Sequence, residues 1–293
     1  MAGQLKEVRS RIKSVQNTQQ ITKAMKMVSA AKLRKAQEGI MQMRPYAKKL
    51  QELLSNIVSG ADGNVGSSLA SERIPEKILY IVITSDRGLC GAYNANIIKL
   101  SKLGIAEKYA AQAAKGNVEI WTIGKKGYEH FTKNKFKVNA EYKDIFLHLN
   151  FESVQASAQA AIKAFENKEF DRVELVYSEF RNAGTQRFVE ERFLPIPKAP
   201  VKEGGRKADF IYEPDRVQLV AELMPKILNT QLYKAVLDAN ASEHGARMTA
   251  MDKATENANE LLKTLKISYN RARQAAITTE LTEIVSGAAA LQG

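Results

Sequence analysis

The sequence contains very few of the side chains from which disulfides, metal centres and catalytic sites are usually built. It has one cysteine, Cys90, and three histidines, His130, His148 and His244, among 293 residues. A single thiol cannot form an internal disulfide, and the histidines lack the spacing of metal ligands. We therefore expect no bound cofactor, no metal site and no catalytic residue in this chain.

Long apolar runs are missing as well. No stretch approaches the roughly 20 apolar residues that cross a bilayer, so we expect no transmembrane helix. Residues 1–16 are charged from Lys6 onward and have no apolar core of the kind found in secretory signals. Glu7 and the periodic pattern around it also argue against an organelle transit peptide, and we expect a cytoplasmic compartment.

Proline and glycine are scarce in the first 58 residues, which contain one proline and two glycines. Apolar residues there recur at alternating spacings of three and four in two blocks, Leu5–Val15 and Ala36–Ile57. This heptad pattern is typical of supercoiled helices. Ile21, Met25 and Val28 lie between the blocks and out of phase with them, which predicts a local slip of the apolar seam.

The C-terminal region shows a second heptad pattern. From Asp215 to its end the chain is predicted to be helical, with a kink or a break at Pro225. Heptad spacing extends over Ala258–Ala276 and then, one residue out of phase, over Ile277–Leu291. The economical arrangement of two such seams is an antiparallel coiled coil. Because the C-terminal helix is the longer one, its tip is expected to project beyond its partner.

The residues between the two seams have a different pattern. Short apolar strands alternate with helices over residues 76–213, which predicts an inserted α/β domain with a largely parallel, Rossmann-like sheet. A Gly/Ser-rich linker is expected at 59–77. The predicted fold class is therefore α plus α/β, with a coiled-coil helix over 1–58, the inserted domain, and a helix over 214–293 that completes one antiparallel shaft.

The segment TSDRGLCGAYN, residues 84–94, follows a predicted strand and opens a helix, which is where α/β folds bind phosphate. Its Gly88 and Gly91 do not have the spacing of a dinucleotide-binding or P-loop motif. A tight strand-to-helix turn explains the glycines better, and Cys90 is expected to be a small buried hydrophobe. A nucleotide-binding enzyme is thus the least favoured interpretation.

Positive charge is concentrated at the N-terminal end. Residues 1–60 carry twelve lysines and arginines and three glutamates, and the whole chain has a net charge of +12. Such a helix can bind nucleic acid, an anionic membrane or an acidic protein. Tyr46 is the one aromatic residue in this region, whereas nucleic-acid binding usually uses several aromatic or arginine side chains. A coiled-coil nucleic-acid-binding protein is kept as the alternative.

The last turns of the C-terminal helix have little charge. No lysine or arginine follows Arg273, and no charged residue follows Glu283. A helix that is apolar on nearly all sides is normally buried, and a single coiled-coil partner covers only one side. Something outside this chain is therefore expected to surround the tip.

Three segments resemble the gamma subunit of F-type ATP synthases: QNTQQITKAMKMVSAAKLRKAQ at 16–37, TSDRGLCGAYN at 84–94 and YNRARQAAITTELTEIVSGAAA at 269–290. Their order and spacing fit that family, and the resemblance is looser between about 110 and 205. The resemblance implies a bacterial, non-catalytic rotor shaft. Such a shaft stands inside a hexamer of alpha and beta subunits, and its foot contacts the epsilon subunit and the c-ring.

The resemblance also implies how the complex works. Ion flow turns the ring and the shaft, and the shaft drives each beta subunit in turn to release ATP. ATP, ADP and Mg²⁺ are held by the alpha and beta subunits, and nucleic acid is not a partner. The chain would be a peripheral membrane protein on the cytoplasmic side of the bacterial inner membrane.

Roles for individual residues follow from the same resemblance. Met25 and Arg247 match residues that face, or lie near, an acidic segment of the beta subunit. The polar residues that match contacts with beta loops are Arg273, Gln274, Thr278 and Glu280. The apolar surface of the tip, which the residue pattern predicts without the resemblance, is formed by Ile277, Leu281, Ile284, Ala288 and Leu291. The foot near epsilon and the c-ring includes Phe210, Tyr212 and Glu213.

Overall fold

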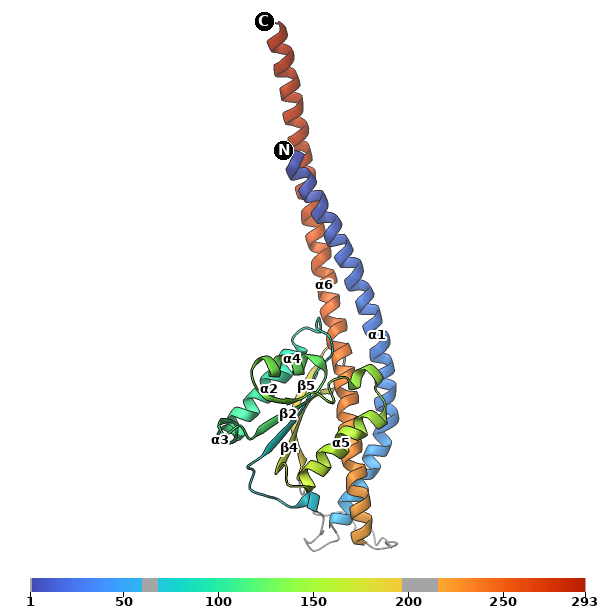
Figure 1. The fold of residues 1–293 in the computed structure, drawn as a ribbon. Helices are drawn as coiled ribbons and strands as arrows, with labels where there is room; N and C mark the ends of the chain where they lie inside the picture. Colours follow the sequence, from blue (N-terminus) through green and yellow to red (C-terminus); the bar gives the residue numbers. More distant parts are fainter. Residues whose placement is uncertain (1, 60–67, 197–215, 293) are drawn as a thin grey trace. The chain divides into compact units, whose positions relative to one another are not determined.

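Two long helices open and close the chain. The computed structural model describes residues 2–59, 68–196 and 216–292. Helix α1 (Ala2–Ser59) is followed by five strands with shorter helices between them, and helix α6 (Arg216–Gln292) comes last (Figure 1). The predicted combination of long terminal helices with an α/β insert is confirmed.

The chain forms two compact units. The first, called the shaft unit below, comprises residues 1–29 and 248–293, and the second, called the domain unit, comprises residues 30–247. Each unit contains part of α1 and part of α6. Among the helices in the described ranges, none has an apolar stretch sufficient to cross a lipid bilayer.

The domain unit is built on one sheet with the strand order β3-β2-β1-β4-β5. Strands β3, β2, β1 and β4 are parallel, and β5 pairs antiparallel with β4. The strands are β1 (Ile78–Ile83), β2 (Val118–Ile123), β3 (Lys137–Asn139), β4 (Arg172–Phe180) and β5 (Gln186–Leu194). The prediction of a largely parallel sheet is confirmed.

Short helices connect the strands. They are α2 (Tyr93–Lys108), α3 (Ala110–Ala114), α4 (Lys125–Lys133) and α5 (Phe151–Glu166), with single 3₁₀ turns η1 (Ser68–Ala70) and η2 (Ile145–His148). Helix α5 begins after Asn150, whose side-chain oxygen accepts a hydrogen bond from the backbone N–H of Ser153 at 2.8 Å. This N-cap satisfies one of the donors that every helix leaves free at its start.

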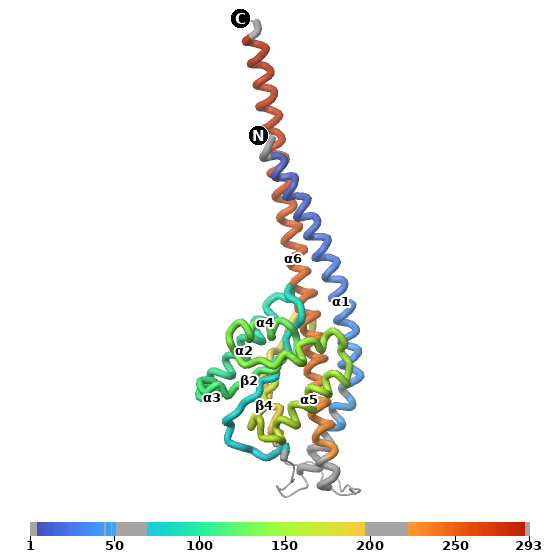
Figure 2. Tube along the Cα trace, in the orientation of Figure 1, coloured from blue at the N-terminus to red at the C-terminus, as the bar shows by residue number. Residues whose placement is uncertain are grey.

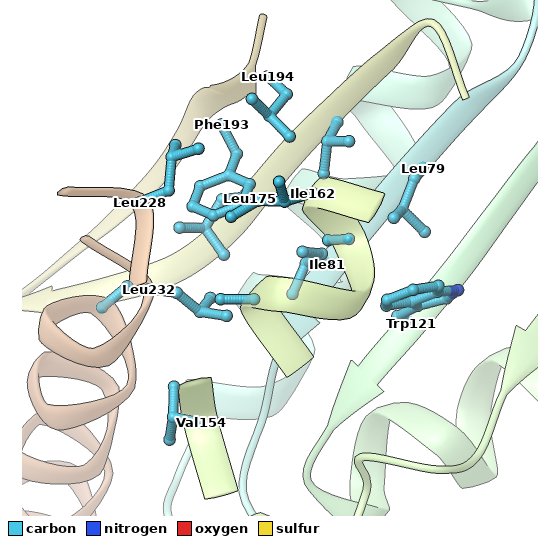
Figure 3. Packing of buried hydrophobic residues seen from close by; sticks show 14 of the residues in the cluster. Leu79, Ile81, Trp121, Val154, Ile162, Leu175, Phe193, Leu194, Leu228 and Leu232 are labelled. Atoms are coloured by element: carbon cyan, nitrogen blue, oxygen red, sulfur yellow. The ribbon is translucent and has the colours of Figure 1, made fainter. Parts of the chain in front are cut away.

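Side chains of the central strand alternate between two buried clusters, as the pleat of a strand requires. The cluster on one face contains Leu79 and Ile81 and is covered by α5 and by Leu228 and Leu232 of α6 (Figure 3). The cluster on the other face contains Tyr80 and is covered by α2 and α4. The sheet is therefore enclosed on both faces, which is typical of a parallel sheet.

In the shaft unit, α1 and α6 lie side by side and run in opposite directions (Figure 2). Thr22 contacts Thr255, and one turn further along α1, Lys26 contacts Asp252. Helix α6 continues past the first residue of α1, and residues 281–290 are all exposed. The predicted projection of the C-terminal tip is confirmed.

The predicted slip of the apolar seam is wrong. Ile21 and Val28 are 59% and 57% exposed, so they do not face α6. The three-four spacing instead continues in phase from Val15, and the residues that it places on the seam are Gln19, Thr22, Lys26 and Ser29. Helix geometry decides which positions of α1 face α6, whatever the polarity of the residues there. In this part of α1, those positions are occupied by polar residues.

These polar seam residues bond across the helix pair. The hydroxyls of Thr22 and Thr255 are 2.8 Å apart. The Lys26 ammonium lies 2.5 Å from Asp252 Oδ1, and the Gln19 side-chain amide donates to the Asn259 carbonyl oxygen. Directional bonds of this kind fix which residues of two helices face each other.

Of the kink or break expected at Pro225, the break is absent. Helix α6 runs from Arg216 to Gln292 with Pro225 inside it. Met224 and Leu228, on either side of the proline, are buried in the cluster that α5 covers. Packing on both sides thus maintains the helix although proline removes one of its hydrogen bonds.

The Thr22–Thr255 contact predicts how removal of each hydroxyl changes stability. Thr22→Val and Thr255→Val should each lower the free energy of unfolding by about 0.5–1.5 kcal/mol, because each removes one member of a hydrogen-bonded pair. The double variant should lose less than the sum, because both hydroxyls are then replaced by isosteric methyl groups. Urea unfolding followed by circular dichroism measures all three.

Thr264→Val provides the matched control. Thr264 lies on the same helix, is exposed, and donates to the carbonyl oxygen of Glu260 at 3.2 Å, so the control removes an intrahelical bond alone. Strict additivity of the two seam substitutions would contradict the cross-helix bond.

Candidate functional site

The shaft unit exposes apolar side chains of α1 that the seam does not use. Ile21, Met27 and Val28 are 57–60% exposed, and together they are called the α1 patch below. Ile21 and Val28 are seven residues apart and therefore lie on the same side of the helix. Met25, between them, is half-buried at the edge of the seam. Because polar residues occupy the seam, these apolar groups are available to a partner.

The tip of α6 is a second exposed apolar surface in the same unit. Ile277 and Leu281 are 48% and 58% exposed, Ile284 is 67% exposed, and Ala288 is also exposed. These residues lie off the stripe of α6 on which Ala272, Ala276 and Thr279 are half-buried. The polar residues singled out near the start of the tip are exposed as well: Arg273, Gln274, Thr278 and Glu280.

Threonine hydroxyls of the tip are turned onto their own helix. Thr278 donates to the carbonyl oxygen of Gln274 at 2.9 Å, and Thr282 donates to that of Thr278 at 2.8 Å. Their hydrogen-bonding needs are met within α6. A partner that surrounds the tip therefore meets methyl groups more than free hydroxyls.

Arg247 differs from these exposed residues because it is buried in the domain unit, with 8% of its surface exposed. One end of its guanidinium donates to Glu243, one turn earlier on α6, and lies 3.4 Å from His244 Nδ1. The other end donates to the backbone carbonyl oxygens of Arg87 at 3.0 Å and Gly88 at 3.3 Å. This arrangement, called the clasp below, joins α6 to the loop that follows β1.

The loop after β1 is a tight turn. Leu89 and Gly91 adopt positive φ angles of 63° and 61°, and Cys90 is 2% exposed. The Ser85 hydroxyl donates to the Arg87 carbonyl oxygen at 2.7 Å. The predicted turn and buried cysteine are confirmed. At the end of β1, where α/β folds often cradle phosphate, this chain places its own arginine against the loop carbonyls.

Burial shifts the pKa values of the ionisable groups in and beside the clasp. It raises the pKa of Glu243, although the Arg247 guanidinium acts in the opposite direction. Burial also lowers the pKa of His244 to about 4, with smaller contributions from the positive charges of Arg247 and Lys32. The pKa of Asp86 is raised, again chiefly by burial.

Some of the predicted site residues cannot be placed. Phe210, Tyr212 and Glu213 lie outside the described residues, and so does the side chain of Leu291. Within the described ranges there is no group of three or more His, Cys, Asp and Glu residues placed to hold a metal ion.

Sequence reasoning missed the polar seam and the partners of Arg247. Continuing the three-four spacing from Val15 would have identified the seam. The clasp has no comparable signal, because Arg247 and the Arg87 carbonyl oxygen are separated by 160 positions in the chain.

The low pKa of His244 predicts how the free energy of unfolding depends on pH. The unfolded chain binds a proton at this histidine near pH 6.5, whereas the folded chain does so only near pH 4. Between these pH values the unfolded state binds one more proton at His244 than the folded state does. Because of His244, the free energy of unfolding therefore falls as pH is lowered, by up to about 1.4 kcal/mol per pH unit. The raised pKa values of Glu243 and Asp86 act in the opposite direction in the acid range.

His244→Gln should therefore flatten the acid slope of stability between pH 6.5 and pH 4 relative to the parent chain. Urea unfolding midpoints measured across this range would test it. His148→Gln, at an exposed position, should leave the slope unchanged, and equal slopes in the parent and the His244 variant would contradict the buried, neutral histidine.

Comparison with known proteins gives a consistent result. A family model described as ATP synthase matches residues 4–291. The ATP synthase gamma chain of Cytophaga hutchinsonii is 51% identical over 290 residues, covering 98% of both chains. The gamma chain of Flavobacterium johnsoniae is 50% identical over 289 residues, covering 99% of both.

Solved structures show the same fold at lower identity. A chain of the Euglena gracilis mitochondrial ATP synthase, determined as an OSCP/F1/c-ring structure, superposes with a TM-score of 0.67 at 21% identity, covering 99% of this chain and 95% of that one. The rotor structure of the same enzyme gives a TM-score of 0.62 at 20% identity. With a family match over almost its whole length and relatives of equal length that share half of its residues, the chain belongs to the ATP synthase gamma chain family.

Proposed function

We propose that this chain is the central rotor shaft of an F-type ATP synthase. It couples rotation of the ion-driven c-ring to the conformational cycle of the catalytic beta subunits, for ATP synthesis or, in reverse, for ATP hydrolysis. The observation that carries the proposal is the tip of α6, which is helical, largely apolar and exposed over residues 281–290. A helix end of this kind needs an external collar, and a ring of alpha and beta subunits supplies one.

The chemistry of the tip suits a surface that turns. Burial of apolar groups is non-directional, so an apolar helix can rotate inside an apolar collar without passing high barriers. Buried ion pairs would behave differently, because separating one costs several kcal/mol. The threonine hydroxyls of the tip bond to their own helix and do not anchor it at one angle.

The basic N-terminal helix suits a moving electrostatic contact. The excess of lysine and arginine in residues 1–60 complements an acidic segment of the beta subunit, and charges attract over roughly 8–10 Å without requiring one geometry. Met25 and the α1 patch would meet beta subunits on this side of the shaft. Arg273, Gln274, Thr278 and Glu280 would meet beta loops near the start of the tip.

Arg247 would act mainly through its contacts within the chain. Its guanidinium holds the loop after β1 against α6, and the loop and the helix then present one surface to the neighbouring beta segment. Glu243 compensates the buried positive charge. We therefore regard Arg247 as a positioning residue.

The remaining assignments concern other subunits. Phe210, Tyr212 and Glu213 would form part of the foot on epsilon and the c-ring, and the complex would be attached peripherally at the cytoplasmic side of a bacterial inner membrane. ATP, ADP and Mg²⁺ would be bound by alpha and beta. The comparisons favour this interpretation over a nucleic-acid-binding protein, because the relatives that they identify are ATP synthase gamma chains.

Reconstitution tests the proposal. The purified chain should not hydrolyse ATP by itself, because the glycines of the loop after β1, Gly88 and Gly91, lack the spacing of a phosphate-binding motif. Mixed with the alpha and beta subunits of the Cytophaga hutchinsonii enzyme, it should co-elute with them in gel filtration and stimulate their ATP hydrolysis. Separate elution of the chain, or turnover in a preparation free of beta, would contradict the proposed role.

The tip provides a sharper test. Ile284→Ala should weaken the assembled complex by up to about 2 kcal/mol through lost burial and leave rotation intact. Ile284→Asp should weaken it more, because the collar would then enclose an unpaired charge. Thermal stability of the complex and single-molecule rotation measure the two effects.

Glu283→Gln serves as the control for a change of charge next to the tested position. If the assembled Ile284→Ala complex lost its torque, the tip would have to transmit force through specific contacts, and the bearing interpretation would be wrong.

A further inference from the structure

A groove of about 800 Å³ lies between α2 and α4, on the face of the sheet opposite α5. The apolar part of its lining, called the floor below, comes from α2 through Ala95, Ile98, Leu103 and Ala106. Leu103 is 44% exposed, which is high for a leucine beside a packed core. None of these residues is among those assigned a role in the rotor above.

The charged part of the lining, called the rim below, is mainly basic. Lys99 and Lys102 project from α2, and Lys126 and Lys133 project from α4. The one acidic residue of the lining, Glu129, is already paired with Lys126 at 2.6 Å. Lys99, Lys102 and Lys133 form no ion pair with any residue in the described part of the chain, so three positive charges of the lining lack a compensating carboxylate.

His130 adds an unsatisfied polar atom to the same lining. Its Nε2 is buried and makes no hydrogen bond to the residues that the structure describes. Burial lowers the pKa of this histidine, and the charges of Lys102 and Lys133 lower it further. The two lysines therefore act on the same point from α2 and α4.

The chemistry of the groove selects among possible occupants. A lipid bilayer is flat and would not reach the floor of a concave groove. A second copy of this chain carries a net charge of +12 and would be repelled. A small polyanion could use the lysines but would leave the apolar floor uncovered. An acidic protein segment with one apolar face satisfies both the rim and the floor.

The length of the groove sets the length of the segment. The lining residues of α2 extend from Asn94 to Ala106, which corresponds to about 18 Å at 1.5 Å per residue. We propose that this groove binds an acidic amphipathic helix of a partner protein, with its apolar face on Ile98 and Leu103 and its carboxylates toward Lys99, Lys102 and Lys133.

A designed peptide tests this proposal on the full chain. The probe is a fluorescently labelled helical peptide of about 14 residues, with leucines along one face and glutamates on both flanks. Fluorescence anisotropy should show saturable binding that Lys102→Glu combined with Lys133→Glu weakens by at least about tenfold. Leu103→Gln should weaken binding several-fold, because it removes apolar contact without changing charge.

Matched controls separate the groove from general charge. Lys115→Glu combined with Lys163→Glu makes the same change in net charge at exposed positions outside the groove and should alter affinity by less than about threefold. A peptide with glutamine in place of glutamate should bind at least tenfold more weakly. Circular dichroism of each variant checks that the fold is retained.

Several results would overturn the proposal. They are absence of saturable binding to the parent chain, equal loss in the groove and control variants, and equal binding of the glutamine peptide. Phosphatidylglycerol vesicles and inorganic triphosphate serve as competitors. Displacement of the peptide by either one at a concentration below that of unlabelled peptide would assign the groove to a lipid surface or a small polyanion instead.

Discussion

The structure depends on how completely α6 is covered at each point along its length. In the domain unit most residues from Leu228 to Arg247 are buried, because the sheet and α5 pack against this part of α6. In the shaft unit one stripe of α6 is covered by α1, and from residue 281 onward the helix is exposed. One continuous helix thus serves as a core element, as half of a coiled coil and as a free surface.

Hydrogen bonds join the buried part of α6 to the α/β domain. The Tyr93 hydroxyl donates to the Ala239 carbonyl oxygen at 2.9 Å, and the Ser242 hydroxyl donates to the Ser178 carbonyl oxygen at 3.1 Å. The clasp around Arg247 does the same. These directional bonds set the position and rotation of α6 against the α/β domain, which apolar packing alone would leave less well specified.

The polar seam and the apolar outer surface of the shaft unit both follow from which side of α1 faces α6. Threonine, lysine and glutamine at seam positions contribute less burial than leucine would, but they fix the pairing of the helices. Ile21, Met27 and Val28 are then left on the outside. The exterior of this helix pair therefore carries both apolar and basic side chains.

The sequence by itself determined the order of the elements, the parallel sheet, the two long terminal helices and the projecting tip, because hydrophobic periodicity and chain length are local properties. It also pointed to the family through three segments. Only the tertiary structure decided which side of α1 faces α6, since a seam is defined by a partner and polar residues can occupy it. The clasp, the continuity of α6 through Pro225 and the basic groove between α2 and α4 were likewise decided by packing between residues far apart in the chain, and such contacts leave no pattern in the local sequence.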